Sequence, residues 1–128
     1  MTRESKFRGQ RTDTKEWVYG YLFRIWDEAY ILWGTTNGVP NMIEVIPETV
    51  GQYAGLNDTY ETEIYEGDIV ECYQKQEHIR GHIVFEDACF FVKFTNGQRA
   101  WIDGAVKQFG AIIIGNCTDN PELIPKEE

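Results

Sequence analysis

Short apolar and aromatic runs alternate with turn-forming residues along this chain, and no segment carries the apolar spacing of a helix. The first long run covers residues 16–26, is broken by Asp27-Glu28 and resumes over residues 30–33. A broken run of aromatic and β-branched residues predicts a β-hairpin. Residues 34–40, with the pair Asn37-Gly38 inside, are predicted to form an exposed loop or turn, and Asn96-Gly97 is the strongest hairpin signal in the chain.

The same reasoning predicts further strands at residues 42–46, 49–56, 63–73, 82–86, 89–95, 98–102 and 109–116, with a turn at Gly67-Asp68 inside the region 63–73. A polar loop is expected over residues 74–80, and the best helix candidate is the short segment 103–109. Many short strands separated by turns indicate a small barrel or sandwich-like sheet. We therefore predict a mainly β, small multi-stranded protein with little helix. It should form a single domain over residues 1–128, with flexible ends at 1–6 and 125–128.

Composition favours a folded chain. Of the 128 residues, 42% are hydrophobic and 14% are aromatic, which is ample material for a core. No apolar run has the length of a signal peptide or of a membrane span. The three cysteines, Cys72, Cys89 and Cys117, make a poor disulfide framework. These features predict a soluble, cytoplasmic protein.

Negative charge is concentrated in one part of the chain. The net charge is −9, yet residues 25–74 contain ten acidic and no basic side chains, so the other 78 residues sum to +1. An acidic stretch repels phosphate backbones, which makes duplex nucleic acid a poor partner. It would suit a basic protein or a divalent cation, and it would also serve as a solvated surface that keeps the protein soluble.

Three segments carry a family resemblance. Lys-Phe-Arg-Gly at residues 6–9 is followed by Lys-Glu-Trp-Val-Tyr-Gly at residues 15–20. The most specific segment is Pro-Glu-Thr-Val-Gly-Gln-Tyr-Ala-Gly-Leu at 47–56, followed by Glu-Ile-Tyr-Glu-Gly-Asp-Ile-Val at 63–70. Ile-Gly-Asn at 114–116 then precedes Asn-Pro-Glu-Leu at 120–123. In order and spacing, these segments resemble the YopX family of bacteriophage and prophage proteins.

The resemblance implies a phage or prophage gene of a Gram-positive bacterium and a β-rich fold with an SH3-like barrel element. It implies no biochemical activity for any residue. The chain departs from the family pattern at residues 57–61, where a turn usually rich in Lys, Asn and Gly is Asn-Asp-Thr-Tyr-Glu. This departure deepens the acidic stretch and argues against a function shared through basic residues there.

Two sets of residues stand out within these motifs. Four glycines suit the turns of the fold, where positive φ or a tight bend is needed: Gly51, Gly55, Gly67 and Gly115. Asp68 can accept hydrogen bonds from backbone amides of its own turn. The candidate acidic interaction surface consists of Glu61, Glu63, Glu66 and Asp68.

Candidate chemistry is sparse. Zinc-ligating atoms occur in four residues, Cys72, His78, His82 and Cys89. In an extended strand the two histidines would be roughly 13 Å apart, too far for one ion. The clustered carboxylates show no sign of the opposed environments that a catalytic pair needs, and no nucleophile or phosphate-loop motif is present. We expect no enzyme activity, no catalytic residue, no metal and no cofactor.

These observations favour a non-enzymatic phage accessory protein that binds a basic host or phage protein through its acidic surface and exposed aromatic residues. One alternative is an assembly protein that self-associates into a homo-oligomer through strand edges or aromatic patches. A second is a β-barrel that binds single-stranded nucleic acid, with Arg3, Lys6, Arg8 and Arg11 supplying phosphate contacts. The acidity of the predicted barrel counts against the second alternative. No membrane partner is expected.

Overall fold

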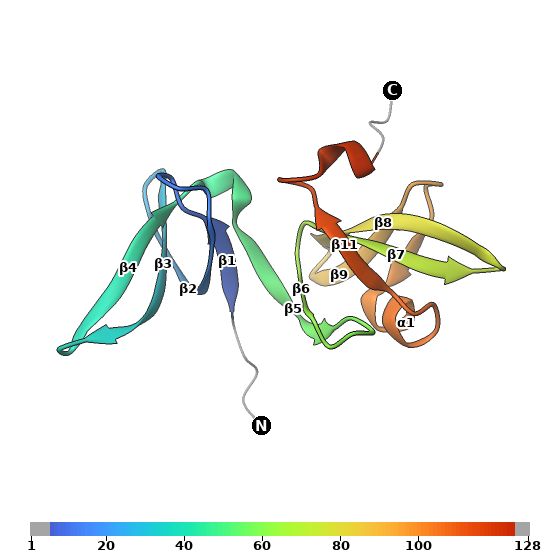
Figure 1. The fold of residues 1–128 in the computed structure, drawn as a ribbon, viewed down its shortest axis with the longest axis horizontal. Helices are drawn as coiled ribbons and strands as arrows, with labels where there is room; N and C mark the ends of the chain where they lie inside the picture. Colours follow the sequence, from blue (N-terminus) through green and yellow to red (C-terminus); the bar gives the residue numbers. More distant parts are fainter. Residues whose placement is uncertain (1–5, 125–128) are drawn as a thin grey trace. The chain divides into compact units, whose positions relative to one another are not determined.

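Alternating apolar and polar residues produce a structure whose regular elements are mainly antiparallel strands (Figure 1). It is a computed structural model that describes residues 6–124. The predicted flexible ends, 1–6 and 125–128, lie outside these residues except for Lys6. The chain divides into two compact units, of which the first ends at Tyr53 and the second begins at Ala54.

The first sheet has the strand order β4-β3-β2-β1-β5-β6. Its strands are β1 (Phe7–Gln10), β2 (Trp17–Ile25), β3 (Glu28–Thr36), β4 (Val39–Val45), β5 (Gly51–Asn57) and β6 (Glu63–Tyr65), with the 3-10 turn η1 (Pro47–Thr49) before β5. Strand β5 begins in the first unit and ends in the second. The predicted hairpin is confirmed, because Leu22 on β2 pairs with Ile31 on β3.

One face of the first unit's sheet forms a small core. Successive side chains of a strand point to opposite faces, so every second residue of β2, β3 and β4 contributes to it. Its fully buried members are Ala29, Ile31 and Val45. Partly buried residues pack around them: Phe7, Val18, Leu22, Ile43 and Val50.

The second unit contains a five-stranded antiparallel sheet with the order β10-β9-β8-β7-β11. Its elements are β7 (Asp68–Gln74), β8 (Glu77–Glu86), β9 (Cys89–Phe94), β10 (Arg99–Trp101), the helix α1 (Ile102–Lys107), β11 (Ile112–Asn116) and the 3-10 turn η2 (Pro121–Leu123). Helix α1 overlaps the best helix candidate of the sequence, 103–109, but begins and ends earlier. It places Ile102 and Ala105 in a core with Val70, Ile83 and Val92.

The mainly β fold with little helix is confirmed. Strands β10 and β11 are the two edges of the five-stranded sheet, so over the described residues this sheet is not closed by hydrogen bonds. The SH3-like barrel element therefore stays a prediction.

The predicted polar loop over residues 74–80 is wrong. Strands β7 and β8 continue through it, with Gln74 paired to Glu77, and only Lys75 and Gln76 form the turn. Both turn residues have positive φ, 51° and 66°, as a two-residue hairpin turn requires. Neither is a glycine or an asparagine, so the usual turn signal is missing from the sequence.

The four motif glycines divide into two kinds. Gly55 and Gly67 have φ values of +87° and +92°, as predicted for turns or bulges. Gly51 and Gly115 lie instead within strands β5 and β11, so their assignment to turns is corrected. At Gly115 a Cβ atom would lie 2.5 Å from Oδ1 of Asn120, so close approach of a side chain explains this glycine.

Candidate interaction surfaces

The ten acidic residues of the stretch 25–74 do not form one surface. Five are exposed, three are half-buried and two are buried. Of the four residues predicted as an interaction surface, Glu61 is exposed and Glu63 and Glu66 are half-buried. Asp68 is only 2% exposed, so it belongs to the interior and not to a surface. Glu71 is half-buried, and its carboxylate oxygens lie 3.4 Å from Nδ1 of His78 and 3.6 Å from Nε of Arg80.

Both buried carboxylates bind backbone amides. The Oδ2 atom of Asp68 accepts a hydrogen bond of 2.8 Å from the amide of Tyr65, as predicted for its turn. Asp58, which is 5% exposed, accepts from three amides. Its Oδ1 atom is 2.9 Å from the nitrogens of Tyr60 and Thr62, and its Oδ2 atom is 3.0 Å from that of Ile113. These two acidic residues therefore stabilise the fold.

The excess negative charge lies in one of the two units. Residues 1–53 contain seven acidic and six basic side chains, a net charge of −1. Residues 54–128 contain 14 acidic and six basic side chains, a net charge of −8, and the two values sum to −9. The acidic stretch of the sequence crosses the unit boundary, but the imbalance belongs to the second unit.

The first unit presents an exposed aromatic face on the side of its sheet opposite the core. Alternate residues of β2 point to this side, and four of them are exposed: Tyr19, Tyr21, Phe23 and Ile25. The cross-strand register adds Tyr30 and Leu32 from β3 and Met42 from β4. We call these seven residues the aromatic face. Tyr21 is 67% exposed and Met42 is 51% exposed, so large apolar groups meet solvent here.

Carboxylates border the aromatic face. Glu28 pairs with Ile25 in the β2–β3 ladder, and Glu44 pairs with Tyr30 in the β3–β4 ladder. The Tyr30 hydroxyl donates a hydrogen bond to Glu28, and its ring lies 6.3 Å from that of Phe23. This hydrogen bond raises the pKa of Tyr30, with further contributions from desolvation and from the charges of Glu28 and Glu44. The border is therefore negative.

Two residues of the basic cluster near the start of the sequence, Arg8 and Arg11, make contacts within the protein. Arg8 is buried and its guanidinium lies 4.5 Å from the ring centroid of Trp17. Arg11 makes two hydrogen bonds of 2.9 Å to Asp13, which lower the pKa of Asp13 and raise that of Arg11. Arg3 lies outside the described residues.

The four residues considered for zinc are not brought together. Cys72 faces the core, whereas its strand neighbour Tyr73 pairs with His78, which is exposed. Within residues 6–124, no group of three or more His, Cys, Asp or Glu side chains is arranged to hold a metal ion. In the same part of the chain, no helix has the length and apolarity needed to cross a membrane.

The fold and these surfaces define a mainly β protein with two antiparallel sheets and an exposed aromatic face. A family model described as YopX protein matches residues 6–125 of this chain. The match covers nearly the whole sequence, so the chain belongs to the YopX family. The resemblance seen in the sequence motifs is thus confirmed.

The structure is similar to the crystal structure of protein EF1440 from Enterococcus faecalis, with a TM-score of 0.61. The two chains are 23% identical, and the alignment covers 97% of this chain and 100% of the other. At this identity the similarity shows the fold alone. Among curated proteins, none matches the chain.

The sequence analysis anticipated exposed aromatic residues but did not say which ones. The signal was present in the alternation of β2, where residues 19, 21, 23 and 25 are all large and apolar. The intervening residues Val18 and Leu22 are also apolar, so the sequence pattern predicts a strand that is buried on both faces. Only the pairing with β3 and β4 shows which of the two faces lies in the core.

Proposed function

We propose that this YopX protein is a non-enzymatic binding module that docks a protein partner through the aromatic face of its first unit. The observation that carries the proposal is the alternation on β2, which leaves Tyr19, Tyr21, Phe23 and Ile25 exposed on one side of the sheet. A contiguous exposed apolar patch is typical of a protein interaction site. Exposed tyrosines also supply binding energy at a low cost in conformational entropy.

The border of the aromatic face defines the chemistry of the partner. Glu28 and Glu44 flank the apolar residues, and Asp27 lies exposed in the adjoining turn. The partner therefore presents an apolar groove with basic residues at its rim, because opposite charges at a rim favour association and orient the encounter. This retains the basic partner of the sequence hypothesis but moves the contact from Glu61, Glu63 and Glu66 to the first unit.

The biological setting follows from the family resemblance. A phage or prophage gene would place this module among accessory proteins that act on a host or phage protein. The aromatic face supports binding of such a partner, and it identifies no reacting group.

A differential capture experiment tests this proposal. Tagged protein with Tyr21→Thr and Phe23→Thr would be compared with the unaltered protein in a bacterial lysate, with bound proteins identified by mass spectrometry. Threonine keeps the β propensity of the strand while removing both rings. We expect the loss of a specific basic protein, and we expect the purified pair to bind at least tenfold more weakly, as for interface anchors worth more than 1.4 kcal/mol.

Tyr60→Thr is the matched control, since Tyr60 is exposed but lies in the second unit. It should retain the partner. If the double variant captures the same proteins as the control, the proposal is wrong. Sedimentation of the purified chain tests the alternative of self-association, because a homo-oligomer that the double variant converts to a monomer would show that a second copy occupies the face.

A further inference from the structure

The outer face of the second unit's sheet collects cations within an acidic unit. The register places His82 on β8 between Ile69 on β7 and Lys93 on β9, and Lys93 lies opposite Arg99 on β10. Arg80 lies two residues before His82 on β8, so its side chain points to the same face of the sheet as that of His82. The side chains of Ile83 and Val92 point the other way, into the core. Residues from three adjacent strands therefore form one basic row.

Most of the described lysines and arginines of the second unit lie on this face of the sheet. The described residues of the second unit contain five lysines and arginines, Lys75, Arg80, Lys93, Arg99 and Lys107, and three of them lie on this face. The acidic residues on the same face are Glu71, next to Arg80, and Glu86, which is 2.9 Å from Arg99. Three positive and two negative charges leave the face at +1 with neutral histidines, although residues 54–128 as a whole carry −8.

Aromatic rings flank the basic row at both ends. Trp101 is 62% exposed, and its ring lies 5.0 Å from that of Phe91, which it opposes across β9 and β10. The guanidinium of Arg99 lies 5.6 Å from the Phe91 centroid. At the other end, the exposed ring of Tyr73 lies 5.2 Å from that of His78. The basic row therefore lies between two exposed aromatic side chains, Trp101 and Tyr73, although Ile69 beside His82 is fully buried.

We propose that this face binds single-stranded nucleic acid, independently of the protein docking assigned to the first unit. Unpaired bases would stack on Trp101 and Tyr73, while Arg80, Lys93 and Arg99 would contact the phosphates between them. Every base has a flat face, so such a site binds with little sequence preference. The acidic surface of the rest of the unit repels nucleic acid. A duplex is disfavoured further, because its base faces are stacked inside and its charge density is higher than that of a single strand.

Fluorescence anisotropy with a labelled oligothymidine of about 20 nucleotides tests the proposal on the full chain. The unaltered protein should bind at low salt and weaken steeply as salt is raised from about 50 to about 200 mM. An oligouridine probe should bind as well, and a duplex of the same length should bind at least tenfold more weakly.

Two variants locate the site. Lys93→Ala should reduce the slope of log affinity against log salt by about 1, as expected for one lost phosphate contact. Trp101→Thr should weaken binding about tenfold, because base stacking on an aromatic ring contributes about 1–3 kcal/mol. Both positions face solvent at least in part, and circular dichroism would confirm that each variant is folded.

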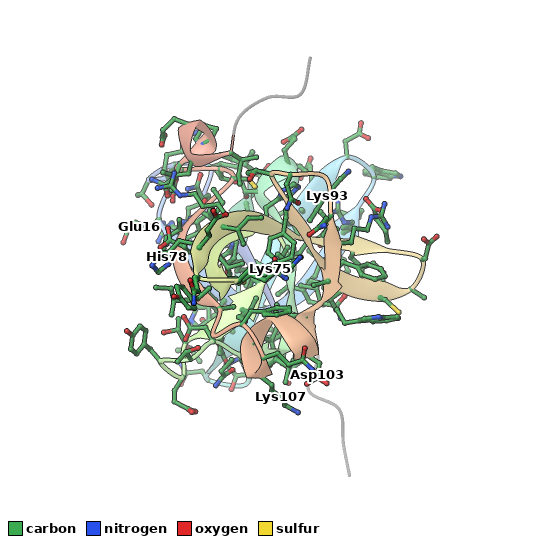
Figure 2. All side chains as sticks on the ribbon, turned by 90° about the vertical axis from the view of Figure 1, so that its right-hand side faces the viewer. Glu16, Lys75, His78, Lys93, Asp103 and Lys107 are labelled. Carbon is green, nitrogen blue, oxygen red and sulfur yellow. The ribbon has the colours of Figure 1, made fainter. Side chains whose placement is uncertain are left out.

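Lys107→Ala is the matched control for charge. Lys107 is on α1 of the same unit, is paired with Asp103 at 2.9 Å, and lies away from Lys93 in Figure 2. Its loss removes one positive charge from the unit without touching the basic row, so binding should be unchanged. Absence of binding at low salt, equal losses in Lys93→Ala and Lys107→Ala, or duplex binding as tight as single-strand binding would each overturn the proposal.

Discussion

At the residue scale, the most informative side chain is Asp58. In the sequence, Asp58 belongs to the acidic stretch 25–74, for which the sequence pattern predicts a role in binding a basic partner. In the structure it fixes the loop over residues 58–62 and joins it to β11, since its two oxygens accept from Tyr60, Thr62 and Ile113. Thr59 adds a further bond to this junction, from its hydroxyl to the carbonyl of Ala111 at 3.0 Å. Negative charge here stabilises the backbone.

Asp58→Ala should therefore destabilise the protein by about 3 kcal/mol, because it leaves three amide donors without their charged acceptor. Asp58→Asn should destabilise the protein less than Asp58→Ala does. Its amide oxygen can still accept a hydrogen bond, whereas its NH2 group would face backbone N–H donors. Urea unfolding followed by circular dichroism measures both. Glu77→Ala is the control, an exposed acidic residue on β8, and should shift the free energy of unfolding by less than about 0.5 kcal/mol. An Asp58→Ala variant as stable as this control would contradict the structural role.

At the element scale, close approach between strands determines which glycines can be replaced. A Cβ atom built on Gly20 in β2 would lie 2.1 Å from the carbonyl oxygen of Leu32 on β3. Gly34 lies on β3 of the same sheet, and a Cβ atom there would meet nothing within 4 Å. The sequence pattern places Gly20 in a strand and Gly34 in the predicted loop 34–40. The second assignment is corrected, because β3 continues to Thr36, and the difference between the two glycines is one of space next to the strand.

Gly20→Ala should lower the free energy of unfolding by about 2–3 kcal/mol, since backbone of β3 must move to admit the methyl group. Gly34→Ala should change it by less than about 1 kcal/mol, because a free position gains from the lower entropy of the unfolded chain. Thermal and urea unfolding of the two variants compare these positions directly. Equal effects would show that the strands accommodate a methyl group at either site.

At the scale of the whole molecule, the two units differ in their capacity to fold. Among residues 6–124, the core of the first unit has three fully buried residues, whereas the core of the second has nine buried members. A core as small as the first gives little stability by itself. Strand β5 runs without interruption from one unit into the other. We expect the first unit to depend on the second, and the chain to unfold as the single domain that the sequence analysis predicts.

Cys72 reports on this coupling, because it lies in the second unit's core. Burial raises the pKa of its thiol to about 11, with a smaller contribution from the charge of Glu71. At pH 8 the folded protein therefore contains almost no Cys72 thiolate, whereas an unfolded cysteine titrates near pH 8.5. The raised pKa means that this thiol favours the folded state below about pH 9 and that the benefit is lost as the pH rises toward 11.

In a Cys89→Ser and Cys117→Ser background, thiol modification at pH 8 should detect unfolding of the second unit alone. We expect Gly20→Ala, a change in the first unit, to lower the urea midpoint of Cys72 modification and that of circular dichroism by the same amount. An unmoved Cys72 midpoint would show instead that the units are independent domains. Gly34→Ala should leave both midpoints nearly unchanged.

Patterns in the sequence were sufficient to predict the class of structure and the family. Alternation, Asn-Gly pairs and the lack of helical spacing predicted a mainly β chain, and three motifs covering most of its length identified the YopX family. These signals are local, since strand preference and turn preference depend on neighbouring residues. The Lys75-Gln76 turn was missed because residues without a turn signature adopt positive φ there.

The environment of individual polar and aromatic residues could not be predicted, because it depends on strand pairing. Asp68, predicted to lie on the acidic surface, and Asp58, from the same acidic stretch, are buried because the fold brings backbone amides to their carboxylates. Tyr21 and Phe23 became exposed because strand pairing chose the other face of β2 for the core. Arg80, Lys93 and Arg99 are separated along the chain and become neighbours only through the register of β8, β9 and β10. Burial and proximity are properties of strand pairing, which depends on residues far apart in the sequence.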